Sequence, residues 1–282
     1  MEANGARKAY STDLTDEQWG EIEPMMPPPK PRGRTRTVDL REVVNAILYI
    51  SRTGCQWRNL PHDLPAKSTV WDYFKRFKED GTLDRLVDAL RRKVREEARR
   101  NPEPETAAID SQTVPTAHQG RDSDVDGGKN VKGRKRHIVV CSMGLLLSVV
   151  VTAANLNEGT QAPNVLGLLS ELTTSRLKRV YADNKYHCKA CHNWVARPDV
   201  RYRIIVVKRD GKKFKLLPKR WVVERTYAWM GYNRRLSKDY ERTTSSSEAF
   251  CKFSMIHLMV RRLHPISGVP EFTYRNGAQK SA

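Results

Sequence analysis

Apolar residues recur at helical spacing through the first hundred positions of the chain. Three segments place an apolar side chain every three or four residues, the pattern of a helix with one buried face. These segments are 39–53, 68–80 and 83–94. Asp39 is suited to cap the first of them, and a proline-rich basic joint at 24–36 is expected to be extended. The pattern predicts a small all-helical domain at 13–100, after a disordered leader at 1–12.

After residue 106 the pattern changes to short runs rich in β-branched residues. The predicted strands are 107–114, 137–141, 145–152, 178–183 and 202–207. The predicted helices are 161–172, 188–196, 219–230 and 247–262. Leu168 and Leu172 are expected to be buried in the first of these helices. The order indicates an α/β domain at 106–263, a mixed sheet with flanking helices, and then a flexible tail at 264–282.

The segment 219–230 divides sharply when it is plotted at about 100° per residue. Val222, Thr226 and Trp229 fall on one side, and Glu224 falls on the opposite side. Three cations fall within about 40° of Glu224, provided that the helix continues through Gly231: Arg220, Arg235 and Lys238. Taken alone, this stripe is typical of a solvated helix face with i,i+4 ion pairs.

The net charge adds information about partners. Lys and Arg total 51 against 32 Asp and Glu, a formal charge of +19 in 282 residues, which indicates a nucleic acid before an anionic membrane. The longest apolar run, Gly144–Leu156, is shorter than the ~20 residues that a bilayer span needs, so no membrane association is expected. Five scattered cysteines and an N-terminus without the apolar core of a signal peptide favour the reducing cytoplasm.

Two aspartates each end or interrupt a β-rich run: Asp110 and Asp183. Sites in open α/β sheets gather at strand ends, and a buried carboxylate needs a positive partner. Mg²⁺ prefers oxygen ligands, and two ions about 3.5–4 Å apart suit phosphodiester cleavage. Glu224, facing the same strand ends from a helix, would complete such a site. Taken singly, each aspartate is more simply a turn former or a helix cap.

Two other motifs are not expected to bind metal. Asp122–Gly127 begins like an EF-hand loop, but Gly133 stands at the twelfth position, where that loop requires a glutamate. Residues 187–192 hold two cysteines and two histidines, which are too close in sequence to surround one tetrahedral zinc. We therefore expect neither calcium nor zinc.

Four motifs resemble those of bacterial insertion-sequence transposases of the insertion-sequence-five family. They are Ile109–Gln112, Gly133–His137, Ala182–Tyr186 and Arg220–Arg225. The resemblance covers about residues 13–263. It implies an RNase H-like fold and a DDE triad of Asp110, Asp183 and Glu224, which binds two Mg²⁺ or Mn²⁺ ions per active site. It also implies that the N-terminal domain binds the ends of the element.

A related signature, Tyr-x2-Arg-x3-Glu-x6-Lys, is only partly met. Arg220 and Glu224 fit it, whereas Leu217 stands at the tyrosine position and Gly231 at the lysine position. Three later cations are candidates to replace the lysine: Arg234, Arg235 and Lys238.

Other cations are candidate DNA contacts. Arg220 lies one turn before Glu224, where it could pair with that carboxylate or hold a DNA phosphate. A basic segment is predicted to form a phosphate track, with a solvated loop as the alternative: Lys132, Arg134, Lys135 and Arg136. In the N-terminal domain a helix–turn–helix would let the helix after Ser68 read a groove, and the alternative is a packing bundle. The candidate contacts there are Trp57, Arg58, Lys75 and Arg76.

Together these features predict a DNA transposase. It would bind the terminal inverted repeats of an insertion sequence, hydrolyse a phosphodiester and use the freed 3′-hydroxyl to attack target DNA, which transfers the strand. Because two ends must be cut and joined, we expect a homodimer or a larger assembly on double-stranded DNA. Two alternatives stay open: a catalytically inactive relative kept as a DNA-binding protein, and an RNase H-like nuclease without strand transfer.

Overall fold

The structure is a computed structural model. It describes residues 7–29, 36–117, 121–207 and 220–266. Part of the expected leader is held in place by contacts: Arg7 forms ion pairs with Asp13, at 2.7 Å, and with Glu42, at 2.6 Å. The expectation of a disordered leader is therefore wrong for residues 7–12.

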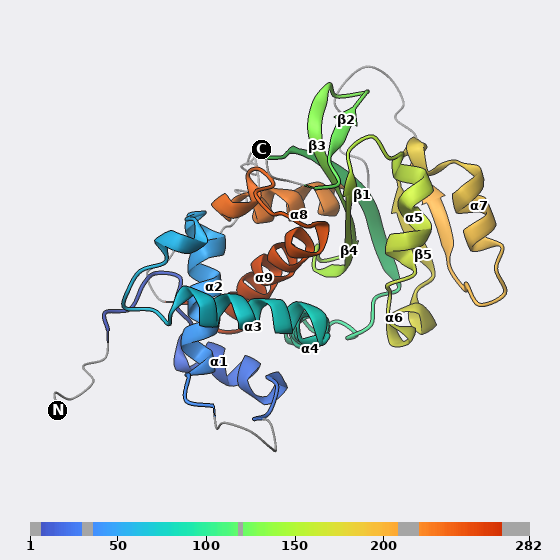
Figure 1. The fold of residues 1–282 in the computed structure, drawn as a ribbon. Coiled ribbons are helices and arrows are strands. Elements are labelled where there is room, and N and C mark those ends of the chain that lie inside the picture. Colours follow the sequence, from blue (N-terminus) through green and yellow to red (C-terminus); the bar gives the residue numbers. More distant parts are fainter. Residues whose placement is uncertain (1–6, 30–35, 118–120, 208–219, 267–282) are drawn as a thin grey trace, which may run out of the picture.

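The N-terminal part of the chain is helical (Figure 1). Its elements are α1 (Asp16–Ile22), η1 (Glu23–Met25), α2 (Leu40–Thr53), η2 (Trp57–Asn59), α3 (Lys67–Glu79) and α4 (Thr82–Glu97). The Asp39 side chain caps α2 by accepting a hydrogen bond from the Arg41 N–H, and Gly54 ends it in a left-handed conformation with φ 74°. The three helices predicted here are confirmed.

A six-stranded mixed sheet forms the centre of the remaining chain. Its strands are β1 (Thr106–Pro115), β2 (Asp124–Asp126), β3 (Val131–Cys141), β4 (Leu146–Ala153), β5 (Arg179–Ala182) and β6 (Arg203–Val206). The order is β2-β3-β1-β5-β6, with β4 also paired to β3. Strands β1, β3 and β4 are antiparallel neighbours, whereas β1, β5 and β6 run parallel. This arrangement is that of an RNase H-like sheet, as the resemblance implied. The short polar strand β2 was not predicted.

Helices follow β4 and cover the sheet: α5 (Glu158–Leu166), α6 (Glu171–Arg176), α7 (Lys189–Val195), α8 (Trp221–Gly231) and α9 (Thr244–Leu263). The single helix predicted at 161–172 was wrong. The chain leaves the helix after Leu166, and Ser170 caps a second one by accepting from the Thr173 N–H. Leu168 and Leu172 lie near this break and are 59% and 56% exposed, not buried.

Alternate residues of the central strands face two separate cores, because successive side chains of a strand point to opposite faces. On β1, Ala108 packs in the core that holds α8 and α9. Ala107 and Ile109 face the other core, which holds apolar residues of α5 and α7. Figure 1 shows these two pairs of helices on opposite sides of the sheet.

The N-terminal helices share the first core with α9. The rings of Phe74, on α3, and Phe250, on α9, lie 4.9 Å apart, and α9 also packs on β4. One buried helix thus joins the helical part to the sheet. The domain limits at 13–100 and 106–263 stay predictions. Among the described residues, no helix is long and apolar enough to cross a membrane.

Candidate active site

The sheet brings the two aspartates together. Strand β1 runs parallel to β5, with Ala107 opposite Val180 and Ala108 opposite Tyr181. When this register is continued by two residues, Asp110 faces Asp183. Each carboxylate has one oxygen fixed by the main chain: Oδ1 of Asp110 accepts from the Ser111 N–H at 2.8 Å, and Oδ1 of Asp183 accepts from the Lys185 N–H at 2.9 Å.

Glu224 comes from α8, which is anchored on both sides. Its Tyr227 hydroxyl lies 2.7 Å from the main-chain oxygen of Arg136 and 3.1 Å from that of Asp110. On the same helix, the Thr226 hydroxyl donates to the Gly144 oxygen, at 2.7 Å, in the turn between β3 and β4. These contacts fix the helix against the strand that carries Asp110.

Arg220 gathers the three acids. Its Nη1 lies 3.9 Å from Oδ2 of Asp110 and 3.6 Å from Oδ2 of Asp183. Its Nη2 lies 3.1 Å from Oε1 of Glu224. The residue is 5% exposed, so its positive charge sits in a poorly solvated place. The acids therefore meet through one guanidinium at the junction of β1, β5 and α8.

Burial controls the electrostatics of Asp110. Removal of this carboxyl from solvent raises its pKa to about 6. The Arg220 guanidinium and the Ser111 N–H act in the opposite direction, and the nearby Asp183 adds to the increase. A positive neighbour therefore favours the ionised form of Asp110.

The turn after β5 is supported by a carboxylate that the sequence did not single out. Glu158, at the start of α5, is 4% exposed and pairs with Lys185 at 2.9 Å. A Cβ on Gly159 would come within 2.4 Å of the Lys185 oxygen, so α5 and the turn are in close contact. The only signal for this role was the capping pair Asn157–Glu158 at a helix start.

The donor set fits a hard divalent cation. It consists of three carboxylates, the ligands that Mg²⁺ and Mn²⁺ prefer, and these already surround a positive charge. Among the described residues, no three His, Cys, Asp or Glu side chains are gathered closely enough to hold one metal ion. Asp110, Asp183 and Glu224 have the ligand chemistry that such an ion needs, but they are not spaced as the ligands of one ion; each lies within 3.9 Å of the Arg220 guanidinium instead.

Comparison with known families places this geometry in context. Residues 101–259, more than half of the chain, match the family described as "Transposase DDE domain", and residues 14–87 match "Putative transposase of IS4/5 family". The chain belongs to the DDE transposases.

Individual relatives agree with this family. The chain is 35% identical over 127 residues to the "Putative transposase for insertion sequence element IS402" of Burkholderia cepacia, a match that covers 43% of the chain and 59% of that protein. It is 33% identical over 114 residues to an "Insertion element IS402 uncharacterized 16.2 kDa protein" of the same organism, with 38% and 76% covered. Among solved structures, a Mos1 transposase paired-end complex with left transposon end matches at 11% identity and a TM-score of 0.25, over 83% of this chain and 80% of that one. A score this low supports no inference.

Three cations of the expected phosphate track are buried in this transposase, so the prediction is wrong for them. Arg134 is 0% exposed and pairs with Asp239 at 3.1 Å. Arg136 is 1% exposed and donates to the Leu236 oxygen at 2.7 Å. Lys135 is also buried and contacts Asp126 and Glu158. The reason is the central place of β3, between β1 and β4. Only Lys132 of the four is exposed.

The prediction of a cationic stripe around Glu224 is also wrong for the residues after Gly231. Helix α8 ends at Gly231, and Asn233 takes an extended conformation with φ −93° and ψ 104°. Arg235 is buried, where it pairs with Glu241 at 2.6 Å and donates to the Cys55 oxygen. Arg234 and Lys238 are exposed, but not on the same helix as Glu224. Leu217, at the tyrosine position of the signature, lies outside the described residues.

The N-terminal candidates divide in the same way. Trp57 is half-buried and packs its ring 5.0 Å from Trp71 and 5.3 Å from Phe74. Arg58 and Lys75 are exposed, and Arg76 lies 3.7 Å from Asp80. Trp57 is therefore placed to support α3, whereas Arg58, which donates to Gln56 Oε1 at 2.6 Å, and Lys75 are exposed to solvent.

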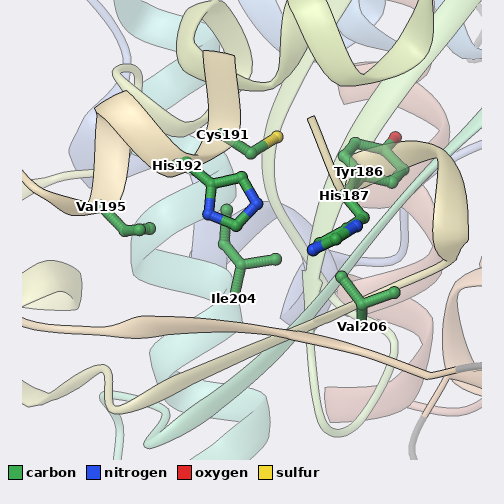
Figure 2. Close-up of a pocket in the computed structure, with 7 residues that line it drawn as sticks. All are labelled: Tyr186, His187, Cys191, His192, Val195, Ile204 and Val206. Carbon is green, nitrogen blue, oxygen red and sulfur yellow. The ribbon is translucent and has the colours of Figure 1, made fainter. Parts of the chain in front are cut away.

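The Cys–His segment after Asp183 lines a small cavity of about 60 Å³. Figure 2 shows the His187 and His192 rings close together, with Cys191 turned away from them. The two rings lie 5.0 Å apart, and the Cys191 thiol donates to the Gly159 oxygen. Burial raises the pKa of this thiol to about 12, so it stays protonated at neutral pH.

Proposed function

We propose that this chain is an active DNA transposase with Asp110, Asp183 and Glu224 as its catalytic, metal-binding triad. Transposase DDE domains generally use divalent metal ions, and we assign two Mg²⁺ or Mn²⁺ ions to each site. The observation that carries the proposal is the convergence of the three acids, from a strand, a strand end and a helix, on one positive charge.

The chain's own residues supply position and charge. When bound, the ions would activate the attacking oxygen and stabilise the leaving oxygen of an in-line displacement. The main-chain N–H groups of Ser111 and Lys185 hold one oxygen of each aspartate, which leaves Oδ2 of each facing the common point. Tyr227 keeps α8, and with it Glu224, at a fixed place relative to β1. Such preorganised donors need little rearrangement during the reaction.

Double-stranded DNA is the proposed partner, both as terminal inverted repeats and as target. The excess of 51 basic over 32 acidic residues supports this proposal, because neutralised phosphates release counterions. The exposed cations proposed to contact phosphate are Arg58, Lys75, Lys132, Arg234 and Lys238. Arg220 and Arg76 are proposed as further phosphate contacts. Cutting and joining two ends requires two active sites, so we propose a homodimer or a larger assembly on DNA, in the bacterial cytoplasm.

The test is a nicking assay on linear DNA that carries the inverted repeats flanking this gene, with Mg²⁺ or Mn²⁺. Asp110→Asn, Asp183→Asn and Glu224→Gln should each abolish nicking, because the charge of a metal ligand is lost while its size is kept. Repeat binding should persist in all three variants. Asp199→Asn is the matched control, since Asp199 is an exposed acid that pairs with Arg197. Wild-type nicking by any triad variant would contradict the triad.

The same assay separates the alternatives. Nicking followed by joining to a second DNA is the result expected for a transposase. Repeat binding with no nicking by the wild-type protein would favour an inactive DNA-binding relative. Nicking without any joined product would favour an RNase H-like nuclease.

A further inference from the structure

The position of Arg220 has a consequence for metal binding. Its two terminal nitrogens lie within 3.1 to 3.9 Å of carboxylate oxygens from all three acids. A guanidinium keeps its charge at any pH that a protein survives. Part of the negative charge that would attract metal ions is therefore already neutralised, by a group that cannot lose its proton.

A divalent ion and this guanidinium cannot use the same oxygens at full strength. Both are cations, and they would repel each other across a short distance in a poorly solvated site, where screening is weak. On the two aspartates, the oxygen nearest to Arg220 is Oδ2, which is the one that the main chain leaves unused. Arg220 thus competes for the atoms best placed to bind metal.

Few of the contacts that hold Arg220 are close hydrogen bonds. Of its three contacts with the acids, the 3.1 Å contact with Glu224 is the one within hydrogen-bond distance. Its Nε is buried without a hydrogen-bond partner among the described residues. Glu224, the partner in the 3.1 Å contact, is itself 48% exposed at its side chain. A phosphate oxygen is the partner that a guanidinium binds with good geometry.

We propose that Arg220 is a resident counter-cation that competes with divalent metal for the triad, and that a DNA phosphate draws it away. DNA binding and metal binding then strengthen each other, because each ligand favours the position of Arg220 that the other needs. Without DNA, Arg220 lowers the affinity of the triad for metal, so the site becomes active only when substrate DNA is bound. The proposal rests on the proposed function, since it takes the triad as the metal site.

The test measures Mn²⁺ binding to the full chain by electron paramagnetic resonance and by titration calorimetry. Arg220→Gln should bind Mn²⁺ about tenfold or more tightly than the wild-type protein without DNA, because a positive charge beside the ligands is removed. Arg197→Gln is the matched control, since it removes an equal charge that pairs with Asp199, and its affinity should stay at the wild-type value. Equal or weaker binding by Arg220→Gln would overturn the proposal.

A second measurement needs no Arg220 variant. A short duplex oligonucleotide at low salt should tighten Mn²⁺ binding to the wild-type protein. Mn²⁺ that binds to the duplex itself is corrected for by subtracting the signal that the Asp183→Asn protein gives with the same duplex. An unchanged affinity would overturn the proposal even if Arg220→Gln failed to fold. If Asp183→Asn abolishes Mn²⁺ binding while Arg220→Gln matches the wild type, the competition is wrong and the triad stands. If Mn²⁺ binding never depends on Asp183, both proposals fail.

Discussion

The hydroxyl of Tyr227 lies 3.1 Å from the main-chain oxygen of Asp110 and ties α8 to the strand that bears the first acid. The same hydroxyl lies 2.7 Å from the Arg136 oxygen, and burial raises the pKa of Tyr227 well above its usual value. It therefore stays a hydrogen-bond donor at all pH values of interest. Two strands and a helix meet at this one side chain.

Tyr227→Phe should weaken both the fold and the reaction. The change removes the donor but keeps the ring, so buried main-chain oxygens lose a partner at a cost of about 1–2 kcal/mol in the free energy of unfolding. Nicking should slow as well, because Glu224 loses its fixed place. Urea unfolding and the nicking assay measure the two effects. Tyr73→Phe is the control, since its hydroxyl makes no hydrogen bond to described residues, and equal effects of the two changes would contradict the prediction.

Gly144→Ala should destabilise the support of α8 on the hairpin turn. Gly144 has φ 77°, and a Cβ there would lie 2.9 Å from both the Thr226 hydroxyl and the Trp229 ring. We expect a loss of about 1–3 kcal/mol in the free energy of unfolding. Gly231→Ala, at the end of α8, meets nothing within 4 Å and should be neutral or stabilising. Thermal melts of both variants check the contrast, and a harmless Gly144→Ala would refute it.

Substitutions of Arg134 and Lys132, which are two residues apart, should affect different properties: the first the stability of the fold, the second DNA binding. Arg134→Gln leaves Asp239 buried without its cation, and it should cost about 3–5 kcal/mol of stability. Lys132→Gln should leave stability unchanged and reduce the salt dependence of DNA binding by about one phosphate contact. Urea unfolding and binding titrations at several salt concentrations measure these outcomes. If Arg134→Gln were as stable as the wild type but bound DNA more weakly, the prediction that Arg134 contacts phosphate would be supported instead.

His137 should make the protein less stable in acid. Burial, and then the nearby Lys135, lower the pKa of His137 to about 4 in the folded state, against 6.5 for an ordinary histidine. Its contribution is complete above about pH 6.5 and is lost as the pH falls towards about 4, because the unfolded chain takes up the proton first. Between about pH 7 and about pH 5 the wild type should lose about 2 kcal/mol relative to His137→Gln. Parallel stability curves for the two proteins would contradict this.

The sequence singled out three acids that the structure places around one guanidinium, and their role as the site stays a prediction. Asp110 and Asp183 follow apolar runs whose strand character is local, so the strands could be predicted. Asp183 comes directly after β5, whereas Asp110 lies within β1. The helical projection singled out Glu224, and the resemblance implied its role in the triad. Each of these predictions rested on the residue and its immediate neighbours.

The errors concern residues whose environment comes from distant parts of the chain. Arg134 and Arg136 look like surface cations until Asp239 and the Leu236 oxygen are brought beside them. Arg235 likewise finds Glu241 only because the chain turns sharply after Gly231. A buried arginine cannot be told from an exposed one by its neighbours in sequence, since its partners are set by tertiary contacts.

Helix α9 packs against both α4 and β4, so the N-terminal helices and the triad belong to one frame. If α3 binds a duplex, the acids would lie a fixed number of base pairs away from the sequence that α3 contacts. The protein would then act as a ruler, and the position of the cut would follow from the dimensions of the fold and from no base contact at the cut itself.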